Sequence, residues 1–487
     1  MNGAVLVVGT TSGAGKSTVV AGLCRALFRR GAYVAPFKAQ NMSNHAAVTR
    51  DGGEIGRAQA MQAAAARVAL DRRMNPILLK PTAGMRSHVV VMGDERSTTD
   101  AQGYGTTAQI LKPVVLDAFT SLRSDYEMVV AEGAGGAAEI NLLDRDLVNL
   151  PFAQAAGIPA VLVVDIDRGG AFAAAHGTID LLPSDLRACV QGIVINQFRG
   201  DVSLLDDGIR ELESRHGVPV LGVLPFLDPP PVLGVEDSLD VPLGFAGVNW
   251  SADPIRVVAV RLPHLANPSD LDPLIAEPDV DVRWSTSPAE IADADLVVLP
   301  GSRSTVADLE WLRVSGIAAA LDRTDATIVG ICAGFQMMGR SIDDEIESGR
   351  GLVEGLGLLD TTTTFAEPKI VRVRSGDGAI GYEIRFGRPS IGAQPWLRFA
   401  EGPEGAVRGR CFGTSLHGIF DGDRVRHSFL ADVAEYAGRT YEPGPLFVDA
   451  LEAHHERLAD WIEDHVNVAR LLAIASTAID PEDAPGW

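Results

Sequence analysis

Short apolar segments alternate with stretches of helical periodicity twice along this chain, and this alternation constrains the fold more than any other feature. In the first series the strand candidates are rich in Val, Ile or Leu and are followed by Gly or a polar turn. They are Ala4–Val8, Tyr33–Phe37, Met128–Ala131, Ala160–Val164, Gly192–Asn196 and Val218–Leu224. Helices are expected between them, including Lys16–Arg29 and Glu54–Ala69. Buried strands that alternate with helices predict a parallel sheet covered on both faces.

A second series begins at Ile255. Its strand candidates are IRVVAVRL, VDVRW, ADLVVLPG and TIVGIC, and the later segments LVEGLGLLD, KIVRVRS and AVRGRCFG indicate β-rich additions. Between the two series, DPPPVLG and EDSLDVPLG show no sustained period, which is typical of a linker. The sequence therefore predicts an α/β protein with domains at 1–227 and 254–448, a linker at 228–253 and a polar helical tail at 449–487.

Composition argues against several classes of protein. The formal net charge is −22 and the acidic residues are spread out, unlike the basic stripe of a nucleic-acid binder. The four cysteines form no C-x-x-C pair, so a disulfide scaffold and the usual zinc site are not expected. The start of the chain lacks the features of a signal peptide, and no apolar run approaches the ~18 residues of a membrane helix. We therefore expect a cytoplasmic protein; the oligomeric state stays open.

A glycine-rich segment follows the first predicted strand and leads into a helix. In such a phosphate loop, backbone N–H groups cradle phosphate oxygens, a lysine reaches the outer phosphates and a hydroxyl serves Mg²⁺. The candidate ATP-binding residues are Gly13, Gly15, Lys16, Ser17 and Thr18, with Ser17 also a metal ligand. Gly9 lies one residue further from Gly15 than in the common motif, and the alternative is a Gly-rich turn with a chance lysine.

This variant loop resembles that of dethiobiotin synthetase and its relatives. A second similarity is the segment from Val130 to Gly136, whose acid in that group helps to hold Mg²⁺, which makes Glu132 a candidate ligand. A third is Asn196, which by resemblance would contact the nucleotide base. The alternatives are a capping glutamate and a turn asparagine. These relatives use ATP to phosphorylate a carboxyl or carbamate oxygen, so the resemblance implies an acyl phosphate that an amine can attack.

The second half contains a candidate nucleophile. Cys332 follows the predicted strand TIVGI and precedes a helical stretch, and such a turn exposes a thiol at the positive end of a helix. His417, in GTSLHG, is a candidate base, and the N–H groups of Gly301 and Ala333 are candidates for an oxyanion hole. For Cys332 the alternative is a buried small hydrophobe, and for His417 a structural histidine. Cys24, Cys189 and Cys411 are expected to be structural.

This half resembles the triad-type glutamine amidotransferases, in which the cysteine attacks glutamine; Gln336 would help to seat that substrate. Many members have a glutamate two residues after the histidine, where this chain has Ile419. The branch that acts on corrin rings shares that difference, so glutaminase activity is still expected. Ala333 stands where a second glycine is expected, and Asn267-Pro268 is another small departure.

The order of the two halves is similar to that of the cobyric acid synthase family. Segments that carry this resemblance include PFKAQNMSN, DGGEIGRAQ, MNPILLKP, DIDRGG, PGSRSTVAD and GYEI. It implies ATP- and glutamine-dependent amidation of the b, d, e and g carboxylates of adenosylcobyrinic acid a,c-diamide. Lys38 would meet a carboxylate or the γ-phosphate, Asp51 would assist Mg²⁺, and Gln40 and Asn41 would contact corrin or phosphate. For Lys38 and Asp51 the alternatives are a surface charge and a turn residue.

Other functions remain open at this point. One is a different amidase of the same build, such as cobyrinic acid a,c-diamide synthase or a cell-wall-precursor amidase. Another is a non-enzymatic ATP switch, although such a protein would not need Cys332 and His417. A third is an inactive amidotransferase-like scaffold, because Ile419 replaces the usual glutamate.

Overall fold

The computed structural model describes residues 3–82, 86–100, 104–227, 241–246, 251–376, 378–391 and 394–479. The chain forms two compact units, each assembled from separate segments. The first comprises Met1–Ser43, Ile55–Pro231 and Glu452–Trp487, and the second comprises Asn44–Glu54 and Val232–Leu451. Both units are α/β, as predicted. Most of the expected linker, 228–253, lies outside the described residues.

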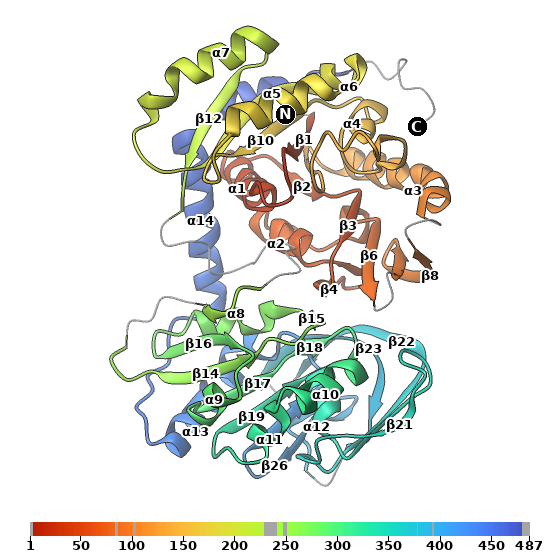
Figure 1. Cartoon of the computed structure of the whole chain (residues 1–487), viewed down its shortest axis with the longest axis vertical. Coiled ribbons are helices and arrows are strands. Elements are labelled where there is room, and N and C mark those ends of the chain that lie inside the picture. The colour runs from red at the N-terminus through yellow and green to blue at the C-terminus, as the bar shows by residue number, and fades with distance from the viewer. Residues whose placement is uncertain are drawn as a thin grey trace. The chain divides into compact units, whose positions relative to one another are not determined.

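The first unit is built on a six-stranded sheet in which all neighbouring strands are parallel. Its order is β12 (Val220–Pro225), β11 (Val190–Phe198), β10 (Ala160–Asp165), β1 (Gly3–Gly9), β9 (Met128–Glu132) and β2 (Val34–Phe37). All six predicted strands are confirmed. Successive residues of β1 belong to two different hydrophobic clusters, one containing Leu6 and Val8 and the other Val5 and Val7. The sheet is therefore covered on both faces, as Figure 1 also shows.

Helix α1 (Lys16–Arg29) has the predicted bounds, but the predicted helix Glu54–Ala69 is partly wrong. A short strand, β5 (Glu54–Gly56), comes first, and the helix α2 spans only Arg57–Ala65. Gly56, the N-cap of α2, is extended, with φ −62° and ψ 142°, and its N–H donates to Asn75 Oδ1 at 2.9 Å. A Cβ there would be 2.5 Å from Asn41 Nδ2.

A second, four-stranded sheet of the first unit is absent from the predictions. It comprises β3 (Gln40–Met42), β6 (Ile77–Thr82), β7 (Arg86–Val91) and β8 (Asp94–Asp100), in that order. β6, β7 and β8 are antiparallel neighbours, whereas β3 runs parallel to β6. This sheet continues the chain beyond β2 and carries Gln40 and Asn41 on its first strand.

The second unit has a seven-stranded sheet of order β13-β16-β14-β17-β19-β27-β26. Its parallel part consists of β16 (Val280–Ser285), β14 (Ile255–Val260), β17 (Leu296–Leu299), β19 (Thr327–Ile331) and β27 (Cys411–Thr414). The four predicted strands of the second series are confirmed. The segment AVRGRCFG is not an addition outside this sheet, because β27 pairs in parallel with β19. Separate from it, β21 (Gly351–Glu354), β20 (Ser341–Asp344), β22 (Thr362–Gly376) and β23 (Ala379–Pro389) form a four-stranded sheet.

The C-terminal residues are helical, as expected, but they are not a separate polar tail. They form α14 (Phe447–His465) and α15 (Val468–Ala475), and the part from Glu452 onward packs with the first unit. Buried Leu458, Trp461 and Ile462 join the hydrophobic cluster of α1. A Cβ on Gly22 of α1 would lie 2.7 Å from Ile462 Cγ1, so glycine allows the close approach of the two helices. Among the described helices, none is long and apolar enough to cross a membrane.

Candidate functional site

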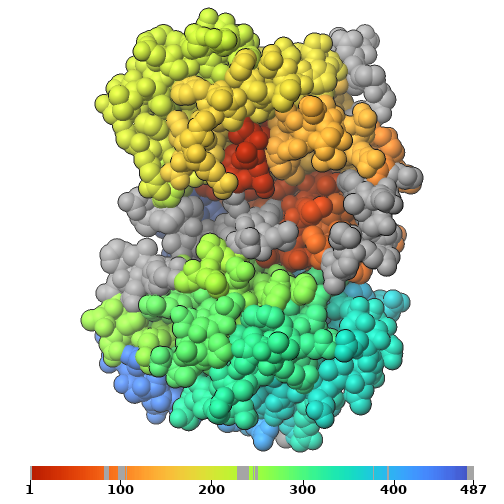
Figure 2. Space-filling view, viewed as in Figure 1, coloured from red at the N-terminus to blue at the C-terminus, as the bar shows by residue number. Residues whose placement is uncertain are grey.

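The phosphate loop lies at the carboxyl end of β1 and leads into α1. Helix α1 has no side-chain cap at its N-terminus; its N-cap is Gly15 in the left-handed conformation, with φ 85°. The Lys16 Nζ donates to the carbonyl oxygens of Thr11 (2.8 Å), Ser12 (3.0 Å) and Gly135 (3.1 Å). Uncapped N–H groups and an adjacent buried ammonium are suited to bind phosphate. Figure 2 shows the red N-terminal segment between the yellow and orange segments of its unit.

A buried carboxylate lies beside this loop. Glu132 ends β9, the parallel neighbour of β1, and is 1% exposed. Its Oε1 accepts hydrogen bonds from Ser17 Oγ and Lys38 Nζ, both at 2.8 Å, and its Oε2 accepts one from Gln62 Nε2. The structure thus brings together three residues that the sequence singled out (Ser17, Lys38 and Glu132), and it adds Gln62, which sequence reasoning missed. Gln62 lies three residues beyond the segment DGGEIGRAQ, which carries the family resemblance.

The remaining predicted residues of this half have different surroundings. Asn196 donates from Nδ2 to the carbonyl of Ala14 in the phosphate loop at 2.9 Å, so it fixes the loop, and base recognition stays a prediction. Gln40 and Asn41 lie on β3, where Asn41 Nδ2 donates to Gln59 Oε1 at 3.3 Å. Asp51 belongs to a segment of the second unit, where it accepts a hydrogen bond from Thr49. Its role in cation binding stays a prediction.

The second unit places Cys332 at a sharp turn between β19 and α12 (Ala333–Met338). Cys332 has φ 52° and ψ −107°, a strained conformation for a residue with a side chain, which is typical of a nucleophile turn. The turn is tight because Gly334 packs directly on β17: a Cβ there would lie 1.9 Å from the carbonyl oxygen of Leu299. The chain fold thus holds the thiol at the carboxyl end of the sheet, 7% exposed.

His417 follows β27 and completes this site together with a residue that the sequence analysis missed. Its Nδ1 is 2.7 Å from Oδ2 of Asp270, and Asp270 Oδ1 accepts from the N–H of Gly418 at 2.9 Å. Burial alone would lower the pKa of His417, but the Asp270 carboxylate and the Cys332 sulfur, with which His417 also hydrogen-bonds, raise it to about 10. A cysteine, a histidine and an orienting carboxylate are the components of a nucleophilic triad.

Asp270 supplies the carboxylate beside His417, although the position of the expected glutamate is occupied by Ile419. Ile419, at the position of that glutamate, is fully buried among the hydrophobic side chains of this unit. Asp270 lies in the 3₁₀ turn Pro268–Leu271, which follows the short strand β15 (Leu265–Ala266). The only hint in the sequence is that Asp270 is an acidic residue shortly after Asn267-Pro268, where the chain departs from the family pattern. The inactive-scaffold alternative rested on the lack of an acid beside His417, and Asp270 supplies that acid.

Gly301, Ala333 and Gln336 are the other residues predicted for this site. Gly301 and Ala333 follow β17 and β19, which are parallel neighbours, and a Cβ on Gly301 would lie 2.9 Å from His417 Cε1. Gln336, on α12, is 3% exposed, and its Oε1 has no partner within the described part of the chain. A buried acceptor without a donor is costly unless a ligand supplies one.

The ring of Tyr382 stacks on His417, with centroids 5.3 Å apart and an interplanar angle of 26°. The backbones of the two residues also exchange hydrogen bonds, Tyr382 N to His417 O at 3.0 Å and His417 N to Tyr382 O at 2.9 Å. Tyr382 belongs to the GYEI segment on β23. It holds the imidazole from the side, a role that sequence reasoning did not assign.

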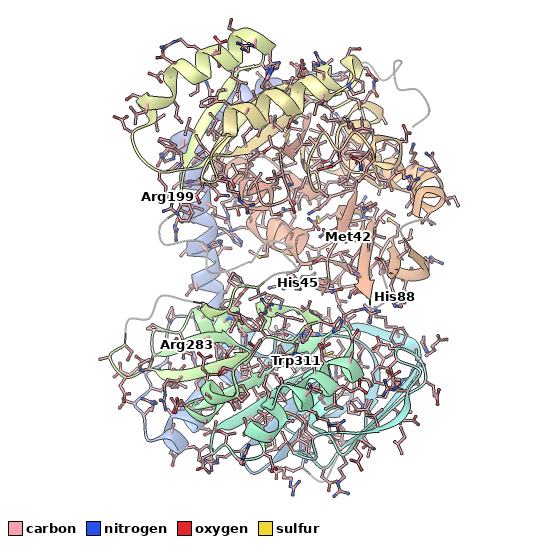
Figure 3. All side chains as sticks on the ribbon, in the orientation of Figure 1. Met42, His45, His88, Arg199, Arg283 and Trp311 are labelled. Atoms are coloured by element: carbon pink, nitrogen blue, oxygen red, sulfur yellow. The ribbon has the colours of Figure 1, made fainter. Side chains whose placement is uncertain are left out.

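The excursion 44–54 from the first half of the chain supports the same region of the second unit. His45, labelled in Figure 3, accepts at Nδ1 a hydrogen bond from the N–H of Asn267 at 3.2 Å. Asn267 has φ 52° and directly precedes the turn that carries Asp270. Residues that the sequence assigned to the ATP-binding half therefore position the acid of the triad.

The other cysteines lack such surroundings. Burial raises the pKa of the Cys24, Cys189 and Cys411 thiols, that of Cys189 to about 11. This agrees with the structural role expected for them, since a raised pKa disfavours the reactive thiolate.

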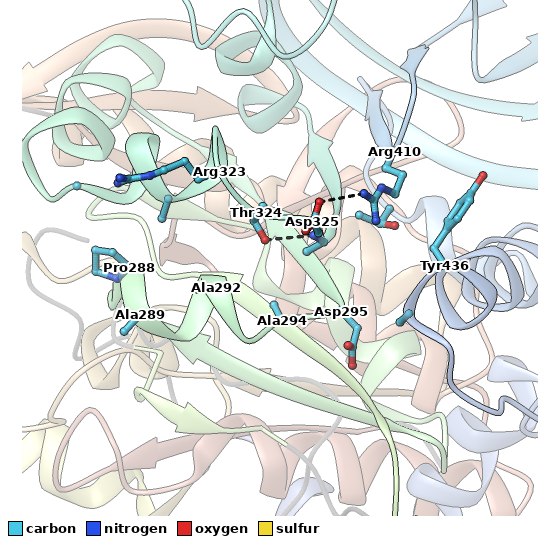
Figure 4. A pocket seen from close by; sticks show the side chains of 15 residues that line it. Pro288, Ala289, Ala292, Ala294, Asp295, Arg323, Thr324, Asp325, Arg410 and Tyr436 are labelled. Atoms are coloured by element: carbon cyan, nitrogen blue, oxygen red, sulfur yellow. Dashed lines mark hydrogen bonds and ion pairs between the residues drawn. The ribbon is translucent and has the colours of Figure 1, made fainter.

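A pocket of about 550 Å³ in the second unit is not this site (Figure 4). Its lining includes Asp295, Thr327 and Arg410, which directly precede or begin β17, β19 and β27. Cys332 and His417 follow the carboxyl ends of these strands. Because the strands are parallel, the pocket lies at the opposite end of the sheet from the thiol.

Comparison with known proteins assigns both units. Residues 5–229 match the CobQ/CobB/MinD/ParA nucleotide binding domain, and residues 256–425 match the CobB/CobQ-like glutamine amidotransferase domain. Cobyric acid synthase of Rhodococcus jostii (strain RHA1) is 48% identical over 500 residues, which covers 99% of this chain and 97% of that protein. Cobyric acid synthase of Mycolicibacterium paratuberculosis (strain ATCC BAA-968 / K-10) is 47% identical over 97% of each chain. With similarity along its whole length and both domains in the same order, this chain belongs to the cobyric acid synthase family.

Proposed function

We propose that this enzyme amidates the b, d, e and g side-chain carboxylates of adenosylcobyrinic acid a,c-diamide, using ATP to activate each acid and glutamine as the source of nitrogen. The observation that carries the proposal is the coexistence of a cysteine–histidine–aspartate triad and a phosphate loop in one chain of this family. The first generates ammonia and the second supports activation of a carboxylate.

In the glutaminase half, Cys332 attacks the side-chain amide of glutamine. His417, held as a cation by Asp270, stabilises the thiolate and then donates a proton to the departing ammonia. The N–H groups of Gly301 and Ala333 would stabilise the oxyanion. Gln336 would accept a hydrogen bond from the substrate through Oε1, which has no partner among the residues that the structure describes. Water then releases glutamate from the thioester.

In the synthetase half, Gly13, Gly15, Lys16, Ser17 and Thr18 would bind the phosphates of ATP, and Asn196 would border the nucleotide. Mg²⁺ would be held by the Ser17 hydroxyl and the Glu132 carboxylate, which are hard oxygen ligands within hydrogen-bonding distance of each other. Such an ion would supply charge neutralisation at the phosphates. Asp51 belongs to the second unit, where it accepts a hydrogen bond from Thr49, and its assistance to the cation rests on the family resemblance alone.

The substrate carboxylate would meet Lys38, whose buried ammonium is paired with Glu132 at 2.8 Å. Gln40 and Asn41 would contact the corrin amides, since Gln40 Oε1 is buried and has no partner among the described residues. Phosphoryl transfer to the carboxylate gives an acyl phosphate, which ammonia converts to the amide with release of phosphate.

The coupling of the two halves tests the proposal. With glutamine present, release of ADP should depend on the corrin diamide, and glutamate should appear in proportion to ADP. ADP release that depends on cobyrinic acid but not on its a,c-diamide would instead indicate cobyrinic acid a,c-diamide synthase activity. ADP release that ignores every corrin would contradict the substrate assignment.

A further inference from the structure

The two oxygens of Glu132 have different kinds of partner. Oε1 is shared by a hydroxyl and an ammonium, since Ser17 Oγ and Lys38 Nζ both lie 2.8 Å away. Oε2 accepts from the amide of Gln62. A divalent cation that binds on the Ser17 side would therefore compete with Lys38 for Oε1, whereas the bond from Gln62 to Oε2 can persist.

Within the described residues, the bond to Glu132 is the one hydrogen bond of the Gln62 side chain. Gln62 is 1% exposed on α2, and within the described part of the chain its Oε1 has no partner. Its amide orientation is fixed because Oε1 would repel the carboxylate if it replaced Nε2. Burying an amide with one end unpaired is unfavourable, so the residue type points to a role at Glu132.

We propose that Gln62 is a positioning residue of the phosphate site: it holds Glu132 through Oε2 while Oε1 exchanges between Lys38 and the cation that accompanies the nucleotide. The inference rests on the proposed function. A neutral donor orients the carboxylate without neutralising it, so the negative charge stays available to the cation. Release from Oε1 frees the Lys38 ammonium for the phosphate or the substrate acid.

The test measures binding of Mn²⁺ in the presence of ADP, by electron paramagnetic resonance of free Mn²⁺. The variant Gln62→Met keeps an unbranched side chain of similar length but lacks the donor. We expect its Mn²⁺ affinity to fall about 10- to 100-fold, the usual effect of losing a residue that orients a metal ligand. ADP binding without metal and glutaminase activity should stay close to those of the wild type.

Gln154→Met is the matched control. Gln154 is also a buried glutamine of the first unit, 5% exposed, and its Nε2 donates to the Asp185 carboxylate at 3.1 Å. A general effect of losing a buried amide would appear in both variants, whereas the proposal predicts wild-type Mn²⁺ affinity for Gln154→Met. Gln62→Leu, which also lacks a donor and adds no charge beside Glu132, gives the same test if Gln62→Met does not fold.

Each outcome has a distinct meaning. Wild-type Mn²⁺ affinity in the Gln62 variants would overturn the inference and leave the proposed function intact. Equal losses in the Gln62 and Gln154 variants would overturn it as well. Failure of the unaltered enzyme to bind Mn²⁺ with ADP would contradict the phosphate site of the proposed function itself.

Discussion

Cys332 faces an imidazole whose charge depends on an acid 147 residues away in the chain. The Asp270→Asn substitution keeps the shape of that side chain but removes its negative charge. We expect kcat for glutamine hydrolysis to fall about 10²- to 10⁴-fold, as when the acid of other triads is changed to an amide. Asp281→Asn, which alters a buried acid of the same unit paired with Arg283, serves as the control.

The same substitution has a predicted effect on the pH profile. In the unaltered enzyme His417 stays protonated up to its pKa of about 10. Burial disfavours the charged imidazolium, but Asp270 and Cys332 stabilise it by more. Removing the carboxylate lowers this pKa, so the imidazolium is lost at a lower pH. The alkaline limb of kcat/KM for glutamine should therefore move to lower pH in Asp270→Asn. An unmoved limb would contradict the assigned role.

Gln336 gives a second prediction at this scale. In Gln336→Met the buried acceptor is lost, and the KM for glutamine should rise about tenfold, the value of one buried hydrogen bond. Amidation driven by added ammonia should be unaffected, because it bypasses the thiol. A parallel decline of the ammonia-driven rate would indicate general damage to the fold.

These residues also show how far sequence reasoning reached within the site. Cys332 and His417 were predictable because each follows a strand of a parallel sheet, and such strand ends meet at one edge. Asp270 was not, since its side chain is aimed by a 3₁₀ turn after a left-handed Asn267. Gln62 was not predicted for a similar reason. A glutamine one helical turn beyond a motif matches no sequence pattern, and only the fold places it against Glu132.

At the scale of elements, the parallel strands of the two main sheets were predictable because burial on both faces leaves continuous apolar runs. The three antiparallel strands β6, β7 and β8 were not recognised. ILLKPT and RSHVVV lack the alternation of a half-buried strand, and DERSTTD is entirely polar. The break between β5 and α2 was missed because the partner of the Gly56 N–H, Asn75 Oδ1, lies 19 residues further along the chain.

The contact between α1 and α14 yields a prediction about elements. Arg25 is fully buried and pairs with Glu452 and Glu456, whereas Arg29 on the same helix is 34% exposed and pairs with Asp460. Arg25→Met should lower the free energy of unfolding by ~2–4 kcal/mol, and Arg29→Met by less than ~1 kcal/mol. Chemical denaturation measures both, and equal effects would contradict the importance of burial here.

At the scale of the whole molecule, the two units exchange segments of chain. Sequence periodicity located the sheets but could not assign 44–54 or the C-terminal helices, because membership depends on packing between distant residues. Because the C-terminal helices pack in the first unit, they contribute to the stability of that unit. The hydrophobic cluster of α1 includes Leu458, Trp461 and Ile462. Among the described residues, the main cluster of the second unit contains none from the C-terminal helices.

A chain that ends at Leu451 should therefore lose ATP binding but keep glutaminase activity. Each large apolar side chain removed from the first unit contributes ~1.5–3 kcal/mol, enough in sum to unfold a marginally stable unit. Isothermal titration with ATP and a glutamate-release assay measure the two properties. Wild-type ATP affinity in the shortened chain would show that the helices are dispensable.

The central claim is that ammonia made at Cys332 converts corrin acids to amides at the phosphate site. Mass spectrometry of the corrin after incubation with ATP, Mg²⁺ and glutamine tests it most directly. We predict successive losses of ~1 Da, the change from acid to amide that follows activation by ATP. With Cys332→Ser they should vanish in glutamine and return with added ammonia. An unchanged corrin mass while ATP and glutamine are consumed would contradict the assigned substrate.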